Sequence, residues 1–320
     1  MTILITGAAG FIGSQLSLRL LSQKKKVIGI DNLNNYYSVK LKKYRLKKLQ
    51  KFKNFTFIKG DLSKKNSLDI LLNGIKISKI CHLAAQAGVR YSLTNPEIYL
   101  KYNINGFLTI LEYCRKYNNI KLVYASSSSV YGGNTKVPFS VSDDVSNPVS
   151  LYATTKRANE LMAQSYSNLF SLNLIGLRFF TVYGPWGRPD MAIWNFTDAI
   201  INSRPIKVFN KGKMSRDFTY IDDIINGVEK ALEYNFRKKD DKHLIFNLGN
   251  NYPVELKKMI SILENVIGKK ANKIMLPMQL GDVKRTFADI NKSKKLLGYM
   301  PTMDIEKGLL NFVNWYKKYI

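Results

Sequence analysis

The chain opens with a short apolar run that leads directly into a glycine-rich turn. Residues 2–13 read TILITGAAGFIG, and Gly7, Gly10 and Gly13 are spaced three residues apart. Glycine is needed where the chain turns sharply, where the backbone approaches a ligand closely, and where a helix packs tightly on a strand. A helical segment, SQLSLRLL, follows. This strand–turn–helix pattern predicts a dinucleotide-binding unit whose ligand phosphates lie at the helix N-terminus.

A second feature favours a particular dinucleotide. The apolar run at 26–31 ends in Asp31, and a carboxylate at this place accepts hydrogen bonds from ribose hydroxyls and repels a 2′-phosphate. Asp61, at the end of the third apolar run, is a further candidate for contact with the adenine. NAD is therefore favoured over NADP. The same residues would also suit a tight turn and a helix-capping Asp.

Short β-branched runs alternate with helix-length segments through the first half of the chain. The expected strands are 2–6, 26–31, 55–61, 79–85, 121–127 and 174–180. This order predicts right-handed βαβ units, and so an α/β protein with a Rossmann-type, doubly wound parallel sheet. We expect an NAD-binding domain over 1–181, with a returning segment around 217–249. A smaller C-terminal α/β substrate-binding domain is expected over 182–216 and 250–320.

The composition is that of a globular protein except for its charge. Hydrophobic residues make up 45% and charged residues 23% of the chain, but the net charge is +27. Such a charge raises nucleic acid or an anionic membrane as a partner. Only 11 of the 50 basic residues are Arg, however, and Lys is the weaker choice for forked recognition of bases or phosphates. We interpret the charge as a solvated Lys surface, which includes an amphipathic helix expected at 38–52.

Neither membrane nor metal chemistry is indicated. No uninterrupted apolar run approaches the ~20 residues that span a bilayer, and the apolar N-terminal stretch has no basic region before it. Cys81 and Cys114 have neither metal-site spacing nor a disulfide pattern, and are expected as reduced core residues. We expect a cytoplasmic protein with no metal site and with no nucleic-acid or membrane partner.

The stretch YASSSSVYG at 124–132 places four serines directly after an expected buried strand. Ligands of open parallel sheets bind at the carboxyl ends of the strands, so a site is expected here. Tyr152 and Lys156 follow four residues apart and therefore share one face of a helix. A neighbouring ammonium lowers the pKa of a phenol, which can then exchange protons with a sugar hydroxyl. A Tyr and a Lys can also share a helix face by chance, and the serines alone would fit a linker.

Together these motifs carry a family resemblance. The segments TGAAGFIG, HLAAQAGVRYS, YASSSSVYG, YATTK, LRFFTVYGPWGRPDM and SRDFTYIDDI resemble the NAD-dependent epimerase/dehydratase family of the extended short-chain dehydrogenase/reductase superfamily. More narrowly, they resemble its UDP-glucuronate 4-epimerases. The resemblance implies that hydride passes from carbon 4 of a UDP-sugar to tightly held NAD and returns to the opposite face of the 4-keto sugar.

The resemblance also implies roles for individual residues. Ser127 would hydrogen-bond to the 4-oxygen of the substrate, Tyr152 would act as acid and base, and Lys156 would lower its pKa and hold the nicotinamide ribose. The cofactor-binding residues implied are Gly7, Gly10, Phe11, Ile12, Gly13, Asp31, Asn32, Asp61, Leu62, Leu83, Ala84, Ala85, Asn103, Tyr152 and Lys156. The substrate-binding residues implied are Arg90, Ser127, Ser128, Ser129, Thr181, Arg188, Arg216 and Arg285, with Arg216 and Arg285 on the diphosphate.

The serine stretch separates activities within the superfamily. No carboxylate stands at Ser128 or Ser129, where the resemblance implies an acidic pair in dehydratases and one acidic residue, at the second position, in uronate decarboxylases. Neutral hydroxyls can donate to a substrate carboxylate that Asp or Glu would repel. The sequence therefore favours a UDP-glucuronate 4-epimerase.

Three alternatives stay open. A UDP-glucose or UDP-N-acetylglucosamine 4-epimerase is the nearest, and a UDP-glucuronate decarboxylase is a further one. An NAD-sensing or nucleic-acid-associated protein belongs to a different class and is motivated only by the charge. For assembly, the resemblance implies a homodimer in which the helices around 98–117 and 152–170 form a four-helix bundle.

Overall fold

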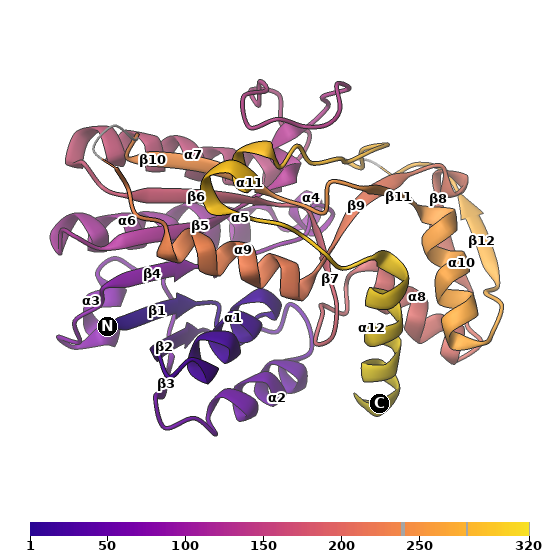
Figure 1. Cartoon of the computed structure of the whole chain (residues 1–320), viewed down its shortest axis with the longest axis horizontal. Helices are drawn as coiled ribbons and strands as arrows, with labels where there is room; N and C mark the ends of the chain where they lie inside the picture. Colours follow the sequence, from indigo (N-terminus) through magenta and orange to yellow (C-terminus); the bar gives the residue numbers. More distant parts are fainter. Residues whose placement is uncertain (238–240, 280, 320) are drawn as a thin grey trace.

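The computed structural model describes residues 1–237, 241–279 and 281–319. Its centre is a seven-stranded, wholly parallel sheet in the order β10-β6-β5-β4-β1-β2-β3 (Figure 1). The strands are β1 (Thr2–Thr6), β2 (Lys26–Asp31), β3 (Phe55–Lys59), β4 (Lys79–His82), β5 (Lys121–Ser127), β6 (Leu174–Phe179) and β10 (His243–Leu248). The predicted Rossmann-type sheet is confirmed. All six expected strands are present, and three of them end one to three residues earlier than predicted.

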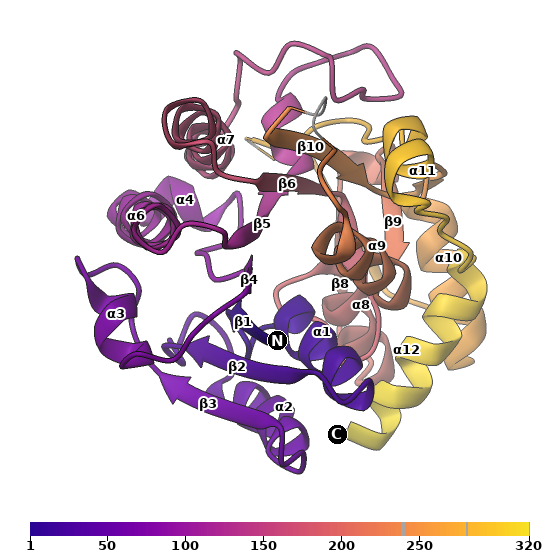
Figure 2. The ribbon, with the colours of Figure 1, turned by 60° about the vertical axis from the view of Figure 1, so that its left-hand side comes forward.

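Alternation along the strands divides the core between the two faces of the sheet. In β1, Ile3 and Ile5 join the core of one face and Leu4 joins that of the other, because successive side chains of a strand alternate. The first face is covered by α1 (Phe11–Ser22), α2 (Val39–Leu49) and α9 (Ile221–Glu233), and the second by α3 (Ser67–Leu72), α6 (Gly106–Lys116) and α7 (Leu151–Phe170) (Figure 2). Burial of both faces explains why the strands read as continuous apolar runs.

The strand order reverses between β1 and β4. Thr6, the last residue of β1, pairs with Ile30 of β2 on one side and with His82 of β4 on the other. At such a reversal the loops after the two strands lead away in opposite directions and leave a crevice at the carboxyl edge of the sheet. The glycine-rich turn and the segment after β4 therefore flank one opening.

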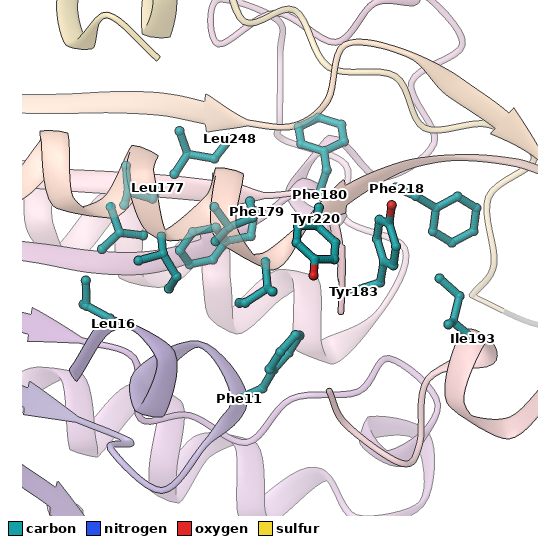
Figure 3. Close-up of a cluster of buried hydrophobic side chains, with 14 of the residues drawn as sticks. Phe11, Leu16, Leu177, Phe179, Phe180, Tyr183, Ile193, Phe218, Tyr220 and Leu248 are labelled. Atoms are coloured by element: carbon teal, nitrogen blue, oxygen red, sulfur yellow. The ribbon is translucent and has the colours of Figure 1, made fainter. Parts of the chain in front are cut away.

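The second half of the chain adds two smaller sheets beside that edge (Figure 1). One contains β7 (Thr181–Tyr183), β9 (Ser215–Tyr220) and β11 (Pro253–Glu255), and in the other β8 (Ile206–Phe209) pairs with β12 (Lys273–Leu276). The helices around them are α8 (Ala192–Ile201), α10 (Leu256–Ile267), α11 (Asn291–Leu297) and α12 (Ile305–Tyr319). Figure 3 shows the apolar cluster that joins this part to the large sheet, with Phe11, Phe179 and Tyr183 in it.

The helix expected around 98–117 consists of three joined pieces. These are α5 (Pro96–Tyr99), a π-helical stretch (Leu100–Asn105) and α6, preceded by the short α4 (Tyr91–Thr94). Within the part of the chain that the structure describes, no helix is long and apolar enough to cross a membrane. Cys81 and Cys114 are buried and unpaired, as predicted.

Helix α2 differs from the solvated lysine helix that the sequence predicted. Lys43 and Lys47 are exposed as expected, but Lys42 and Arg45 are buried, with 4% and 2% of their surface exposed. Tyr44 is also exposed. Residues 42, 45, 46 and 49 lie on one face at the helical period, so the two cations share the inward face with the leucines. The prediction of an amphipathic helix with a solvated lysine face holds for Lys40, Lys43, Lys47 and Lys48. It was wrong for Lys42 and Arg45, because long basic side chains can be buried when their polar ends find acceptors.

Candidate active site

A cavity of about 1190 Å³ lies at the carboxyl edge of the large sheet. Its walls come from the loops after β1, β2, β4, β5 and β6 and from segments of the second half of the chain, including α8. Typical small-molecule pockets measure roughly 300–1,000 Å³, so this cavity has room for more than one ligand group.

The glycine-rich turn forms one end of the cavity, and its backbone leaves no room for side chains. Gly7 has φ +71°, and a Cβ there would lie 2.9 Å from the backbone nitrogen of Ala84. A Cβ on Gly13 would lie 2.1 Å from the carbonyl oxygen of Gly7. Gly10 is the N-cap of α1 without any side-chain cap, so the first N–H groups of the helix are left to a ligand. This cradle fits a pyrophosphate, as predicted from the sequence.

Asp31 is positioned at the end of β2 beside this turn. Its carboxylate accepts hydrogen bonds from the amides of Ala9 (3.1 Å) and Leu33 (2.8 Å) and lines the cavity. Asn32, Asp61 and Leu62 line it as well, and the Asp61 carboxylate accepts from the amide of Ser63 at 2.9 Å. The residues predicted to contact an adenosine therefore share one end of the cavity.

The segment after β4 forms the next wall. Leu83, Ala84 and Ala85, which were predicted to contact the cofactor, line the cavity. Asn103 does not line it. Instead, its side chain is buried, bonds to both the amide and the carbonyl of Gln86 (2.8 and 3.0 Å), and donates to Thr155 Oγ1 (3.0 Å). The structure thus assigns Asn103 the support of the wall, in place of the cofactor contact that was expected.

The serine stretch, Tyr152 and Lys156 meet in the middle of the cavity. Ser127 ends β5 and caps a 3-10 turn (Ser128–Tyr131), accepting from the amide of Ser129 at 3.2 Å. Tyr152 and Lys156 project from the first turns of α7. This helix begins directly after Ser150, whose side chain caps it by accepting a hydrogen bond from the amide of Ala153. The predicted linker alternative is thereby excluded, since all four serines are part of a strand end and its capped turn.

Burial acts on the ionisation of Tyr152 and Lys156 in opposite directions. Burial raises the pKa of Tyr152, while the hydrogen bond with Ser127 and the charge of Arg188 lower it. Lys156 is not among the groups that shift the Tyr152 pKa, and its Nζ donates to the carbonyl of Ala125 at 2.8 Å. The expected lowering of the phenol pKa by Lys156 is therefore not seen here: Ser127 and Arg188 lower this pKa, but burial outweighs them and the pKa is raised.

Lys156 itself is only 3% exposed, and burial lowers its pKa to about 8, while the charge of Glu160 raises it. Glu160 lies one further turn along α7 and pairs with Arg178 through two bonds of 2.9 Å. Ser126 donates to the same carboxylate at 2.6 Å. This buried network lies directly beneath the cavity wall and fixes α7 against β5 and β6.

One part of the cavity wall presents hydroxyl groups without a carboxylate beside them in the sequence. Ser128, Ser129 and Thr181 line it, and no carboxylate lies among them in the sequence or at their strand ends. Arg188 lines the cavity too, but its guanidinium pairs with Asp190, whose other partner is the Tyr36 hydroxyl at 3.1 Å. Desolvation and the charge of Asp190 together raise the pKa of Tyr36 to about 12, so this tyrosine is a neutral donor at ordinary pH.

The remaining predicted arginines are in different surroundings. Arg216 lines the cavity and donates to the carbonyl of Ser215 at 3.0 Å. Arg90 lines it near the rim, is exposed, and pairs with Asp282 at 3.2 Å. Arg285 is exposed, lies over the Phe287 ring at 5.6 Å and is not part of the cavity wall. The structure therefore gives no support to the expected diphosphate contact of Arg285.

Sequence reasoning missed several cavity residues, among them Tyr36, Lys42 and Asp190. Lys42 Nζ donates to the carbonyl and side-chain oxygens of Asn34, both at 2.7 Å, and the charge of Asp31 is close enough to raise its pKa while burial lowers it. Nothing distinguishes Lys42 in a run of lysines. Asp190, in contrast, stands in the motif PWGRPDM and could have been noticed as the acid nearest to Arg188.

No group of three or more His, Cys, Asp or Glu side chains among the described residues could hold a metal ion. The chemistry that the cavity offers is proton exchange by hydroxyl groups beside a buried ammonium, next to a glycine cradle for a dinucleotide.

Comparisons with known proteins agree with this geometry. The family model of the NAD dependent epimerase/dehydratase family matches residues 3–249. Protein CapI of Staphylococcus aureus is 47% identical over 332 residues, which cover 100% of this chain and 99% of the relative. UDP-glucuronate 4-epimerase 4 of Arabidopsis thaliana is 45% identical over 332 residues, or 100% of this chain and 76% of the plant protein.

A solved structure is similar over its whole length. UDP-glucuronic acid 4-epimerase from Bacillus cereus, crystallised with UDP-glucuronic acid and NAD, has a TM-score of 0.92 and 37% sequence identity. The match covers 100% of both chains. With a family model that spans most of the sequence and relatives that are similar from end to end, this chain belongs to the NAD dependent epimerase/dehydratase family.

Proposed function

We propose that this chain is an NAD-dependent 4-epimerase that interconverts UDP-glucuronate and UDP-galacturonate. The observation that carries the proposal is the convergence of Ser127, Tyr152 and Lys156 on one wall of the cavity, beside serines where a carboxylate is absent. The similarity to proteins named UDP-glucuronate 4-epimerases supports the same activity.

The residues of the glycine cradle would hold the cofactor. Gly7, Gly10 and Gly13 leave room for its pyrophosphate, and the Asp31 carboxylate would accept the hydroxyls of the adenosine ribose. Lys156 would hold the nicotinamide ribose. When bound, NAD supplies the hydride chemistry, since it can accept a hydride from carbon 4 of the sugar and return it. A 2′-phosphate would be repelled by Asp31, so NAD fits this site better than NADP.

The proton accompanying that hydride is assigned to Tyr152. Its phenolate would take the proton of the 4-hydroxyl on oxidation, and the phenol formed in this way would give the proton back on reduction, because the same group serves as base and acid in the two directions. Ser127 is hydrogen-bonded to Tyr152 and would hold the 4-oxygen in place. The charge of Arg188, which already lowers the Tyr152 pKa, stabilises the phenolate formed in this exchange.

The uronate carboxylate would be held by the uncharged part of the wall. Oxidation at carbon 4 makes a β-keto acid, which loses carbon dioxide readily when its carboxylate bond aligns with the ketone. Ser128, Ser129 and Thr181 are proposed to keep the carboxylate out of that alignment by hydrogen bonds. Arg188 and Arg216 add positive charge on the substrate side, Arg216 toward the diphosphate and Arg188 toward the sugar.

One assay tests the function. The purified protein is incubated separately with UDP-glucuronate and with UDP-galactose, and the products and any carbon dioxide are identified. We expect UDP-galacturonate from the first and little conversion of the second. Efficient conversion of UDP-galactose with none of UDP-glucuronate would assign a hexose 4-epimerase. Carbon dioxide together with a UDP-pentose would assign a decarboxylase.

For the organisation of the chain, we propose that 1–181 and the returning segment 217–249 bind NAD and that 182–216 and 250–320 bind the UDP-sugar. The location of β10 in the large sheet supports the return. Both parts of the chain line the same cavity, which supports the assignment of NAD to one part and of the UDP-sugar to the other.

For assembly, we propose a homodimer in which α6 and α7 pair with their copies in a four-helix bundle. Leu100 in the π-helical stretch before α6 and Leu108 on α6 are 52% and 39% exposed, and Leu161 and Leu169 on α7 are 54% and 70% exposed. A helical surface with this many exposed leucines is typical of an interface. Sedimentation at micromolar concentration should show a dimer that Leu161→Glu dissociates, and a wild-type monomer would contradict the proposal.

A further inference from the structure

The buried guanidinium of Arg45 bridges two segments that the proposed function assigns to different ligands. On one side, Nη1 donates at 3.0 Å to the carbonyl of Ala9, inside the glycine-rich turn. On the other side, Nη2 donates to the carbonyls of Trp186 (2.6 Å) and Gly187 (2.8 Å). These two residues directly precede Arg188, which lines the substrate side of the cavity. One side chain therefore connects the NAD side with the sugar side.

Arg45 has no acidic partner among the described residues. Its acceptors are the three carbonyls and the hydroxyl of Tyr37 at 2.8 Å, and burial lowers its pKa. A charge buried without a counter-charge is costly, so its retention calls for a gain that an apolar side chain would not provide. The planar guanidinium provides that gain, because its N–H groups reach acceptors in several fixed directions at once.

The segment on the sugar side needs such a support. Trp186 has φ +64°, a left-handed conformation that bulky residues rarely adopt and that persists only where the surroundings impose it. Its ring is fixed by Trp315, with ring centres 5.2 Å apart, and by Lys48 Nζ at 4.4 Å. Its backbone is fixed by the Arg45 fork. The conformation of the loop 184–190, and with it the position of Arg188, therefore depends on Arg45.

We propose that Arg45 is a positioning residue that couples NAD bound at the glycine-rich turn to the loop 184–190, and so to the UDP-sugar. The inference rests on the proposed function for the identity of both ligands. A ligand that orders its own segment also orders the acceptors of Arg45 on that side, so the second ligand meets a loop that is already restrained. Such coupling is reciprocal. If bound NAD raises the affinity of the protein for the UDP-sugar by some factor, the bound UDP-sugar must raise its affinity for NAD by the same factor.

The test measures this reciprocal effect on the holoenzyme. A Tyr152→Phe background allows UDP-glucuronate to bind without turnover. The exchange of bound NAD with added labelled NAD is followed with and without saturating UDP-glucuronate. We expect UDP-glucuronate to slow the exchange by about 5- to 150-fold, the usual range of coupling between sites. In Arg45→Met and Arg45→Lys, we expect the slowing to fall to roughly two-fold or less, since Lys keeps the charge without the fork.

The controls separate this role from general stability. The quantity compared is the ratio of the NAD exchange rate without UDP-glucuronate to the rate with it. Lys47→Met changes the exposed face of the same helix and should leave this ratio at its full value. Each ratio compares one variant with itself, so weaker NAD binding or lower stability alone does not change it. Arg45→Lys decides the question should Arg45→Met not fold.

Two results would overturn the inference while leaving the proposed function intact. One is an unchanged ratio in the Arg45 variants, and the other is no slowing when Arg45 is present. A wild-type protein that retains no NAD, or that does not epimerise UDP-glucuronate, would instead refute the proposed function.

Discussion

Tyr152 and Lys156 lie one helical turn apart in the wall of the cavity, and burial shifts their pKa values in opposite directions. The phenol is pushed toward its neutral form, and the ammonium loses much of its preference for the charged form, with a pKa of about 8. Burial therefore brings only the Lys156 pKa closer to neutral pH and moves the Tyr152 pKa further from it. Ser127 and Arg188 oppose the shift of the phenol, so they set how readily Tyr152 gives up its proton.

Replacing Tyr152 with Phe tests this assignment most directly. The change removes the proton-carrying oxygen and little else, so the fold and the binding of a UDP-sugar should survive. Loss of a general acid or base typically costs about 10²–10⁴-fold in rate, and the turnover of UDP-glucuronate should fall by that factor. Turnover is followed by product analysis, with UDP binding as the control. Near-normal turnover would contradict the role of Tyr152.

Lys156→Met should abolish or strongly reduce activity and yet stabilise the NAD-free protein. The folded-state pKa is about 8 against 10.5 in the unfolded chain, so between those values the unfolded chain holds more protons. Wild-type stability therefore rises with pH across that window, and below pH 8 the buried charge costs about 1–3 kcal/mol. Urea unfolding should show the variant more stable by this amount near pH 7, and the difference should shrink as the pH approaches 10.5. A constant difference across this range would exclude the buried charge as its cause.

At the scale of elements, the turn after β5 is the part of the cavity proposed to select the substrate. Ser127 caps the 3-10 turn, and the Ser127 hydroxyl contacts that of Ser129 at 3.1 Å, so the turn presents neighbouring hydroxyls to the substrate. The adjacent helix α7 contributes Tyr152, Lys156 and Glu160 from one face because they are spaced four residues apart. One turn and one helix thus supply the proposed reacting groups and the buried ion pair that anchors them.

Introducing an acid into this turn should change the reaction. In Ser129→Glu, like-charge repulsion should weaken UDP-glucuronate binding by roughly ten-fold or more, and a proton carrier is added beside the sugar carboxylate. We expect carbon dioxide and a UDP-pentose among the products, measured by gas release and product mass.

Ser129→Gln is the matched control, since it has a similar size without the charge. Should Gln and Glu at this position weaken binding equally and release no carbon dioxide, size and not charge would govern the turn. The proposed part of the serines in holding the carboxylate would then be wrong.

For the whole molecule, both histidines of the chain couple stability to pH. His82 bonds to Thr6 at 2.8 Å and His243 to Tyr124 at 2.7 Å, and both are buried. Burial lowers the pKa of His82 to about 3 and that of His243 to about 4. The folded-state values lie below the ordinary 6.5, so the stability they contribute is full above pH 6.5 and is lost as the pH falls toward 4.

The expected loss is steep. Below about pH 6 the unfolded chain binds two protons that the folded chain does not. The free energy of unfolding therefore falls by roughly 2–3 kcal/mol for each pH unit. Urea unfolding at several pH values between 6.5 and 4.5 measures this slope. His243→Gln removes one of the two groups and should halve it. Equal slopes in the two proteins would show that other groups dominate acid unfolding.

Local patterns in the sequence were sufficient for the sheet, the glycine cradle and the proposed reacting pair. Strands buried on both faces read as continuous apolar runs, and the carboxyl ends of neighbouring parallel strands must meet at one edge. Gly7 directly follows such a strand, and Asp31 and Ser127 end two others, so their convergence could be predicted. Tyr152 and Lys156 needed only the helical period.

The tertiary structure decided everything that depends on segments far apart in the chain. Arg45 bonds to carbonyls 36 and 141–142 positions away, and its burial within a lysine-rich helix has no local signal. Arg285 was expected in the cavity and lies outside it, while Asn103 supports the wall from behind. The ionisation of Tyr152 depends on which groups approach it and on how much water is excluded. Neither quantity is encoded in spacing along the chain, because both arise only when the folded backbone brings distant side chains together.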